Sequence, residues 1–314
     1  MLSYILRRLL GVIPVMLVVG VCVFSLLHLA PGDPAAIIAG DNASPENIAR
    51  IRAGLGLDRP FAVQFVEWGA AVLRGDLGTS MFSGLPVRQL IAQRLEATVS
   101  LAVSTMVVAV VLAVMLGVLA AWRAGTWVDR AVMGVAVTGF SVPVFVVGYA
   151  LVYFLSMKLR WFPVQGYRPI ADGLWDWVRH LALPSLALGL AYVALIARIT
   201  RTSMLEVLSE DYMRTASAKG VATVPLLLGH ALRNAAVPIV TVVGIGVALL
   251  ISGVVITESV FNIPGVGRLV VDAITRRDYP IIQGVMVVFA GVYVLINLGV
   301  DLLYCFIDPR IRYD

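Results

Sequence analysis

Six runs of apolar residues, each interrupted only by isolated polar side chains, dominate the sequence. They cover residues 9–30, 97–120, 131–157, 181–200, 236–258 and 281–305. Each run is long enough to cross a bilayer, because a helix needs about 20 apolar residues to span the hydrocarbon core. Pro184, near the start of the short fourth run, is compatible with a helix there, since the first turn leaves its N–H groups unpaired. The pattern predicts an all-α, polytopic membrane protein with six transmembrane helices.

The composition excludes a water-soluble fold. Of the 314 residues, 60% are hydrophobic and 14% are charged, whereas soluble domains average about 25% charged residues. Six spans leave no room for an added nucleotide-binding domain. Arg7 and Arg8 precede the first run as they would in a secretory signal, but the run exceeds the roughly 7–15 apolar residues of a signal peptide, so we interpret it as an uncleaved span. Cys22 and Cys305 show no metal or disulfide spacing and are interpreted as packing residues.

The distribution of Lys and Arg over the short loops indicates the orientation in the membrane. The side that carries residue 1 has eleven of them: Arg7, Arg8, Arg123, Arg130, Arg198, Arg201, Arg214, Lys219, Arg233, Arg310 and Arg312. The opposite side has seven: Lys158, Arg160, Arg168, Arg179, Arg268, Arg276 and Arg277. Both termini, including the tail 306–314, are therefore expected in the cytoplasm. The segment 31–96 lies beyond the reach of this rule because long segments are translocated largely regardless of charge.

Residues 31–96 are too polar for the membrane and too long for a simple turn, so we expect them to fold outside it. Ser44-Pro45-Glu46 is typical of a helix start, with a cap, a proline at the first position and an acid in the first turn, and Gly54 is a candidate stop. A second helix is expected from Pro60, with aromatic residues at helical spacing, to its end near a glycine: Phe61, Phe65, Trp68 and Gly75. This segment either shields the ends of the spans or provides a docking surface for an external partner.

The sequence carries no signature of catalysis. It contains no G-x-x-x-x-G-K-[ST] loop for nucleotide phosphates, no H-E-x-x-H and no G-x-S-x-G. The three histidines, His28, His180 and His230, are scattered, so no metal site is predicted. No run of like charges resembles a nucleic-acid-binding arm. An intramembrane enzyme or a receptor would need a catalytic pair within the spans or a soluble signalling domain, and neither is visible.

The loop between the fourth and fifth runs contains a short predicted helix, residues 209–220. Ser209 is a candidate N-cap, Glu210 and Asp211 complement the positive end of the helix dipole, and Lys219 suits the last turn before a left-handed stop at Gly220. A helix of about ten residues is marginal alone in water, so it needs a partner. Small residues (Thr215, Ala216, Ala218) let it enter a groove, while Tyr212 and Met213 are candidate anchors. A second short helix with an apolar body is predicted for 226–232.

This loop resembles the cytoplasmic coupling motif of ABC importer permeases, in particular the first permease of the dipeptide, oligopeptide and glutathione systems. The resemblance rests on Glu210-Asp211-Tyr212-Met213-Arg214-Thr215-Ala216-x-Ala218-Lys219-Gly220, followed by His230-Ala231-Leu232-Arg233-Asn234 and Pro238. It extends along the chain through Leu6-Arg7-Arg8-Leu9-Leu10 with Pro14, Pro31-Gly32-Asp33-Pro34, and Val260-Phe261-Asn262-Ile263-Pro264-Gly265-Val266-Gly267-Arg268. Arg214 stands where an older form of the motif has an acid, a departure that the peptide branch shares.

The resemblance implies a type I ABC importer permease fold and a multi-pass location in the bacterial cytoplasmic (inner) membrane. The implied domains are an N-terminal span with a folded periplasmic segment (1–96), a permease domain (97–305) with its coupling helix, and the tail. The implied partners are a second homologous permease, two cytoplasmic ATPases that bind ATP and Mg²⁺, and a periplasmic or lipid-anchored substrate-binding protein. The chain itself would bind no cofactor. The implied cargo is a small peptide, with nickel or another small solute as the alternative.

Two acids and five glycines lie within or at the ends of the last spans. Intramembrane acids are candidates for function because their burial is costly, so Glu258 and Asp301 are candidates for lining the pore, and Glu258 is favoured because it lies on the side where the substrate enters. The alternative is that both acids reach interfacial water or pair locally. The glycines allow close helix approach and are expected at packed interfaces: Gly244, Gly246, Gly253, Gly284 and Gly291.

Overall fold

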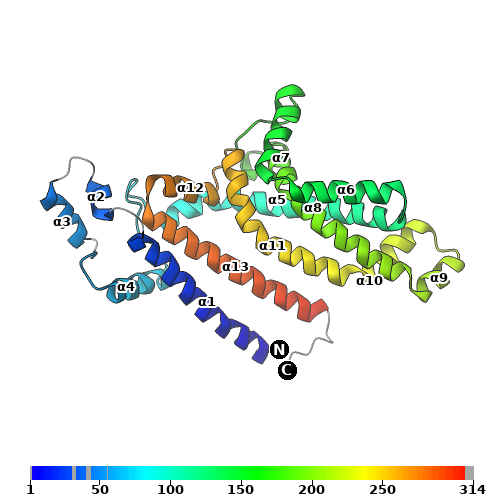
Figure 1. Cartoon of the computed structure of the whole chain (residues 1–314), viewed down its shortest axis with the longest axis horizontal. Coiled ribbons are helices and arrows are strands. Elements are labelled where there is room, and N and C mark those ends of the chain that lie inside the picture. Colours follow the sequence, from blue (N-terminus) through cyan, green and yellow to red (C-terminus); the bar gives the residue numbers. More distant parts are fainter. Residues whose placement is uncertain (1, 30–32, 40–43, 55, 308–314) are drawn as a thin grey trace. The chain divides into compact units, whose positions relative to one another are not determined.

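The computed structural model describes residues 2–29, 33–39, 44–54 and 56–307. Within these ranges the chain forms helices and no β-strand, which confirms the all-α prediction (Figure 1). The helices are α1 (Leu2–Leu29), α2 (Pro34–Ala39), α3 (Pro45–Gly54), α4 (Phe61–Leu73), α5 (Val87–Trp122), α6 (Trp127–Ser141), α7 (Val144–Leu151), α8 (Leu174–Leu208), α9 (Asp211–Ala218), α10 (Leu232–Asn234), α11 (Ala236–Val260), α12 (Val266–Arg276) and α13 (Tyr279–Ile307). Two π-helical segments, Val152–Lys158 and Pro225–Ala231, extend α7 and precede α10.

Five helices are long and apolar enough to cross a membrane, and a sixth span is present if one bent pair is counted as a unit. The five contain or match the predicted runs, at Leu10–Leu29, Val87–Trp122, Leu174–Leu208, Ala236–Val260 and Tyr279–Val300. The bent pair is Trp127–Ser141 with Val144–Lys158, which turns by 108°. The predicted number of spans therefore holds only with this broken member included.

The prediction of one continuous span over 131–157 was wrong, and Pro143 explains why. A proline ring disfavours helical geometry at the preceding residue. Val142 is accordingly extended, with φ −87° and ψ 128°, and it ends α6. Pro143 then serves as the N-cap of α7. The hydrophobic run continues across the break because both halves present apolar side chains, so hydrophobicity alone does not reveal it.

The fourth span also differs from the prediction. Helix α8 begins at Leu174, ten residues before Pro184, so the proline lies inside the helix and not near its start. Gly173, with φ +136°, precedes the first turn. The first turns of α8 contain polar residues, so the apolar run alone does not predict that the helix begins at Leu174.

The chain divides into two compact units, which are described separately. The first unit comprises Met1–Leu95 and Leu269–Val294, and the second comprises Glu96–Arg268 and Leu295–Asp314. The expected domains, 1–96 and 97–305, share the boundary near residue 96, but the first unit also takes in part of the C-terminal region. The domain assignment itself remains a prediction.

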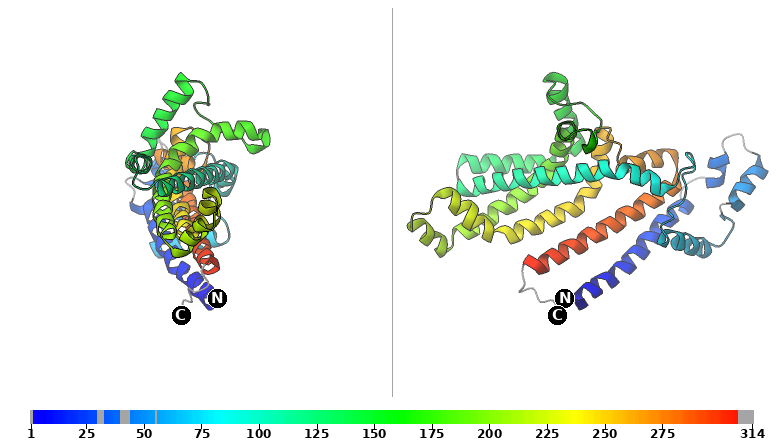
Figure 2. Two further views of the ribbon diagram at one scale, coloured as in Figure 1. Left: turned by 90° about the vertical axis from the view of Figure 1, so that its right-hand side faces the viewer. Right: turned by 180° about the vertical axis from the view of Figure 1, so that it is seen from behind.

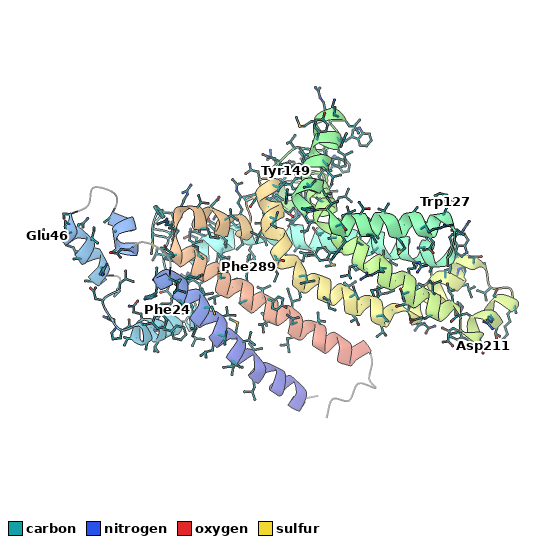
Figure 3. The ribbon with its side chains drawn as sticks, viewed as in Figure 1. Phe24, Glu46, Trp127, Tyr149, Asp211 and Phe289 are labelled. Atoms are coloured by element: carbon teal, nitrogen blue, oxygen red, sulfur yellow. The ribbon has the colours of Figure 1, made fainter. Side chains whose placement is uncertain are left out.

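In the first unit, the extramembrane helices form largely as predicted. The Ser44 hydroxyl accepts a hydrogen bond from the Asn47 N–H at the start of α3, as an N-cap does. Helix α4 follows Pro60 and contributes Phe61, Phe65 and Trp68 to an aromatic cluster with Phe24 and His28 of α1, with ring centroids 5.1 to 6.5 Å apart. Figure 3 marks Phe24, at the end of α1 beside α4. The predicted stripe of aromatic residues therefore packs on the first span.

A buried carboxylate fixes the turn before α5 to the start of α13 in the same unit. Asp278, 2% exposed, accepts a hydrogen bond of 2.6 Å from the Ser80 hydroxyl and one of 3.3 Å from the Met81 N–H. Gly284 of α13 lies against α5, where a Cβ atom would come within 2.7 Å of Val87 Cγ1. These contacts hold together segments about 200 residues apart in sequence.

In the second unit, α8 is the central helix. Helices α6 and α11 both pack along it, as the two views show (Figures 1 and 2). Close approach depends on small residues, as predicted: a Cβ atom on Gly253 of α11 would lie 2.5 Å from Leu188 Cδ1, and one on Gly244 would lie 2.8 Å from Val300 Cγ1. Gly291 is an exception, since a Cβ atom added there would meet nothing within 4 Å among the described residues.

Candidate functional site

Helix α9 forms the predicted short helix, but its N-terminus differs in one detail. The Ser209 hydroxyl donates to the Glu206 carbonyl, 2.7 Å away, and thus ends α8. Ser209 is therefore not the N-cap of α9, and this part of the prediction was wrong because the connection is too short to separate the two helices. Glu210 is the N-cap residue and makes no capping bond with its side chain. The negative charge of Asp211, in the first turn, interacts favourably with the positive end of the helix dipole.

The C-terminus of α9 is closed by Gly220 in the left-handed conformation, φ +82°. The Gly220 N–H donates to the Ser217 carbonyl at 3.0 Å, and the Val221 N–H donates to the Ala216 carbonyl at 3.3 Å. These are the two hydrogen bonds of a Schellman motif, which satisfies helix carbonyls that would otherwise have no partner. The predicted left-handed stop is confirmed, and it gives α9 a defined end despite its eight residues.

The two faces of α9 are different. Met213 is 2% exposed and belongs to the apolar core of the second unit, so it anchors α9 to its own chain. The expectation that Met213 is available to a partner was wrong, because the helix has more apolar contact with its own protein than its sequence indicated. Tyr212 is 46% exposed. The outward face is formed by exposed residues: Asp211, Tyr212, Arg214, Thr215, Ser217, Ala218 and Lys219.

This outward face is small and polar, and interactions among its own side chains contribute little to its stability. Arg214 and Asp211 face each other at 3.5 Å, but both are largely exposed, so their attraction contributes little to stability. Figure 3 shows Asp211 at the outer end of this region. Helix α9 packs against both α8 and the π-helical segment Pro225–Ala231, which buries Leu227 and Ala231. The result is a polar helix presented on a packed apolar base.

An ion pair that the sequence did not reveal joins α6 to α8. Asp129, 4% exposed, accepts hydrogen bonds from Arg201 Nε at 2.5 Å and Nη2 at 2.7 Å. It also accepts one of 3.0 Å from the Gly125 N–H, in the turn between α5 and α6. The bidentate geometry fixes the orientation of both side chains. Because Arg201 lies on the helix that leads directly into α9, this pair ties α6 to the base of α9.

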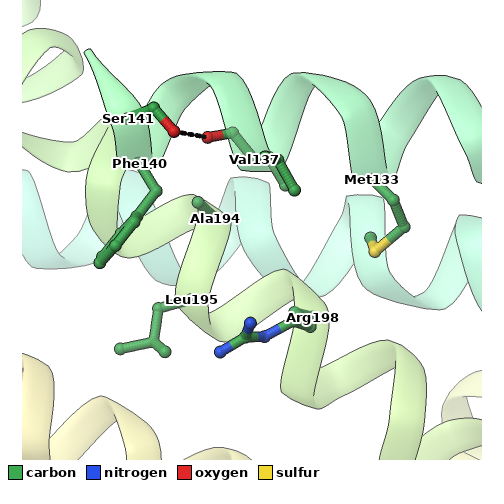
Figure 4. A pocket seen from close by; sticks show the side chains of 8 residues that line it. Met133, Val137, Phe140, Ser141, Ala194, Leu195 and Arg198 are labelled. Atoms are coloured by element: carbon green, nitrogen blue, oxygen red, sulfur yellow. Dashed lines mark hydrogen bonds between the residues drawn. The ribbon is translucent and has the colours of Figure 1, made fainter.

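Beside this ion pair, α6 and α8 enclose an apolar groove of about 180 Å³. Figure 4 shows Met133, Val137 and Phe140 of α6 opposite Ala194 and Leu195 of α8. Arg198 is the single charged residue that lines the groove. In the described part of the chain Arg198 has no ion-pair partner, in contrast to Arg201 three residues later.

Glu258 of α11 is fully buried, and its contacts show a capping role. Its Oε1 accepts a 2.6 Å hydrogen bond from the Thr98 hydroxyl of α5, and its Oε2 accepts a 2.9 Å bond from the Arg268 N–H. Thr98 in turn accepts a 2.8 Å bond from the Val266 N–H. Glu258 and Thr98 thus satisfy N–H groups in the first turn of α12, where a carboxylate is also favoured by the helix dipole. Its expected role in lining the pore remains a prediction.

Close packing near Glu258 requires two glycines, one just before α12 and one in its first turn. A Cβ atom on Gly265 would lie 2.0 Å from Glu258 Oε1, and one on Gly267 would lie 2.7 Å from Val255 Cα. Only glycine fits at these positions, because the backbone lies against the Glu258 carboxylate at Gly265 and against the backbone of α11 at Gly267. The segment from Val260 to Arg268 therefore folds closely around the Glu258 carboxylate and forms the start of α12. The side chain of Asp301, the other predicted pore residue, lies outside the described residues.

Tyr167 anchors the connection between the broken pair and α8. Its hydroxyl donates to Glu96 Oε1 at 3.0 Å and lies 3.1 Å from the Ser100 hydroxyl. Burial, together with the nearby Glu96 carboxylate, raises the pKa of the Tyr167 phenol above its usual value. Among the described residues no group of three or more His, Cys, Asp or Glu side chains has the arrangement of a metal site.

Comparison with known proteins places these features in a family. The family model "Binding-protein-dependent transport system inner membrane component" matches residues 113–313, and the model for the N-terminal part of such membrane components matches residues 1–102. A protein of Sinorhizobium fredii named as a peptide ABC transporter permease is 60% identical over 310 residues, 99% of each chain. The glutathione transport system permease protein GsiC of Salmonella choleraesuis is 48% identical over 313 residues, 100% of each chain.

These matches cover nearly the whole length of the chain, and they agree with its long apolar helices. The family consists of transport components and not of enzymes. The chain therefore belongs to the family of binding-protein-dependent transport system inner membrane components, as a multi-pass permease subunit.

Proposed function

We propose that this chain is one pore-forming subunit of an ATP-driven importer that moves small peptides across the cytoplasmic membrane by alternating access. The names of two relatives that match over their full length, a peptide permease and a glutathione permease, support a peptide cargo. The observation that carries the mechanism is α9, a polar helix with an exposed outer face and a buried anchor, Met213.

The proposed assembly contains partners on both sides of the membrane. A second homologous permease completes the pore, and two cytoplasmic ATPases bind ATP and Mg²⁺, so this chain needs no cofactor. A periplasmic or lipid-anchored binding protein delivers the peptide to the outer side, where residues 31–96 are the candidate contact. In this arrangement both termini and α9 face the cytoplasm. The functional division is 1–96, 97–305 with its coupling helix, and the tail 306–314.

Rigid connections support the proposal that α9 transmits ATPase movement to the spans. Only Ser209 and Glu210 separate α9 from α8, and Met213 fixes α9 to the core. Helix α8 continues for 35 residues without a break, and Arg201 ties it to α6 through Asp129. A displacement of α9 would therefore move α8 and α6 together, which can bias an inward-open against an outward-open arrangement.

The proposed function is tested by uptake into proteoliposomes that contain the complete transporter and enclose ATP. Labelled dipeptide should accumulate only when ATP, the binding protein and this chain are all present. Proteoliposomes with a Gly220→Leu chain should retain the assembled complex but lose uptake. The proposal fails if ATP-dependent dipeptide uptake is absent from the complete system, or if it persists unchanged without this chain.

A further inference from the structure

A cavity of about 270 Å³ lies within the first unit. Its walls come from the end of α1, from α4, from the Gly56–Leu57 turn and from the start of α13. The walls are held in place by contacts already described: the Phe24–Trp68 ring pair, with centroids 5.4 Å apart, on one side, and the Asp278–Ser80 hydrogen bond beside Tyr279 on the other. The cavity is therefore a built feature of this unit and not a gap between loose segments.

One polar group in the wall lacks a partner. Gln283 of α13 lines the cavity and is 7% exposed, and its Nε2 atom is buried without a hydrogen bond to any described residue. A buried amide without a partner is costly, and such a group in a native structure calls for an explanation. If the amide rotates about its terminal torsion so that this N–H₂ group faces the cavity, an occupant that carries a carbonyl oxygen would provide the missing acceptor.

The α4 part of the lining offers hydrogen-bond acceptors, one of them a carboxylate in an ion pair with Arg59. Gln64 uses its Nε2 to donate to the carbonyls of Leu57 and Arg59, which leaves its Oε1 as an acceptor. Glu67 accepts a hydrogen bond from Arg59 through Oε1, and a carboxylate has further acceptor sites on its second oxygen. The free acceptor positions on Gln64 and Glu67 suit a group with several N–H donors, such as a primary ammonium group.

Three aromatic residues, one each on α1, α4 and α13, also line the cavity. Phe24, Trp68 and Tyr279 present ring surfaces that suit an apolar side chain, and aromatic faces also attract a nearby cation. The cavity therefore combines three features: acceptors that include a carboxylate oxygen, an unpaired amide donor and an aromatic surface. An amino-terminal residue of a peptide has the matching set, because it carries an ammonium group, a carbonyl oxygen and a side chain.

We propose that this cavity binds the amino-terminal residue of a small peptide, with its ammonium group at Gln64 and Glu67, its first carbonyl oxygen at Gln283 Nε2 and its apolar side chain on the aromatic wall. This inference rests on the proposed peptide cargo and adds a second peptide contact, on this chain itself. The same ammonium chemistry occurs in the headgroup of phosphatidylethanolamine, and the experiment separates the two sources.

Binding of radiolabelled Leu-Gly to the complete transporter provides the test. The complex is placed in nanodiscs of phosphatidylcholine and phosphatidylglycerol, without binding protein or ATP. We expect saturable binding of Leu-Gly, and at least tenfold weaker competition by N-acetyl-Leu-Gly, which lacks the ammonium charge. Two variants, Gln283→Leu and Glu67→Gln, should each weaken binding by about tenfold or more, because each removes one group that contacts the ligand.

Two matched variants serve as controls. Gln89→Leu and Glu46→Gln make the same chemical changes at exposed positions of the same unit and should bind Leu-Gly like the unmodified chain. Removal of the unpaired amide in Gln283→Leu should leave the melting temperature unchanged or higher, which a purely structural role would not predict. If Gln283→Leu does not accumulate, Gln283→Met provides the same loss of the amide.

The proposal is overturned by any of three results: no saturable binding of Leu-Gly, equal competition by its acetylated form, or wild-type binding by both cavity variants. It is also overturned if added phosphatidylethanolamine displaces Leu-Gly in proportion to its content, because the cavity would then hold a lipid headgroup. Uptake by the complete system is measured separately. Normal ATP-dependent uptake without cavity binding rejects this inference alone, whereas absence of any peptide uptake rejects the proposed function.

Discussion

The buried ion pair between Asp129 and Arg201 provides a sharp test of how α6 is held to α8. We consider two single substitutions, Asp129→Asn and Arg201→Met, and their combination. The two partners are unequally buried: the side chain of Asp129 is 5% exposed and that of Arg201 is 27% exposed. Their loss should therefore have unequal effects.

Arg201→Met strands the Asp129 carboxylate in the interior with only the Gly125 N–H as a partner. Breaking a fully buried pair costs about 3–5 kcal/mol. Because Arg201 is partly exposed and one hydrogen bond remains, we expect a loss of roughly 2–3 kcal/mol. Asp129→Asn leaves an arginine that can reach water, so we expect a loss of about 1 kcal/mol. The double variant strands no charge and should be at least as stable as Arg201→Met.

The assay is denaturant unfolding of the purified chain in detergent, followed by tryptophan fluorescence, with a double-mutant cycle to obtain the coupling energy. We expect a coupling of about 2 kcal/mol, because each side chain contributes mainly through the other. Arg198→Met, on the same helix but at an exposed position, is the matched control and should change stability by less than about 0.5 kcal/mol. Additive single effects, or a larger loss from Asp129→Asn than from Arg201→Met, would refute the reasoning.

Three further predictions each concern one residue. Gly220→Ala should cost about 1 kcal/mol through its positive φ alone, since nothing lies within 4 Å of the added Cβ, and it should lower ATP-driven uptake, whereas Gly229→Ala, equally uncrowded, should not. Gly265→Ala should sharply reduce the amount of folded chain in the membrane, measured by size-exclusion fluorescence, because its Cβ collides with Glu258, while Gly291→Ala should leave it unchanged. Ultraviolet titration should show that Tyr167→Phe removes a phenol that ionises above its usual pKa of about 10; because the folded form keeps this proton longer than the unfolded form, its contribution to stability should fall as pH rises beyond that value. A Tyr167→Phe difference spectrum centred below pH 10 would contradict this assignment.

Much of the fold could be predicted because a membrane imposes a strong pattern. The lipid requires long apolar helices with satisfied backbones, so five spans emerged from the length of their apolar runs. Local chemistry was also informative where one residue decides the backbone: Gly220 ends α9, Ser44 caps α3 and Pro60 precedes α4. The sequence also contains a feature that indicates the break, a proline within a run longer than one span needs. The continuous hydrophobicity of residues 131–157 nevertheless led to the prediction of a single span.

The rest depended on contacts between distant residues. Thr98 and Glu258 are 160 residues apart, Asp129 and Arg201 are 72 apart, and Ser80 and Asp278 are 198 apart. No local pattern identifies such partners, although acids at the ends of apolar runs are a hint that each needs one. Met213 illustrates the same limit: its sequence neighbours are polar, and only tertiary packing shows that it faces the core.

The central claim is that the outward face of α9 receives the cytoplasmic ATPase. Single cysteines at Thr215 and Lys219, both exposed, and at Met213, buried, would be introduced into a chain with Cys22 and Cys305 replaced by serine. A bifunctional thiol–amine cross-linker is then applied to the complete transporter from the cytoplasmic side. The account predicts cross-links to the ATPase from Thr215→Cys and Lys219→Cys and none from Met213→Cys. Absence of ATPase cross-links from both exposed positions, with the complex intact, would contradict it.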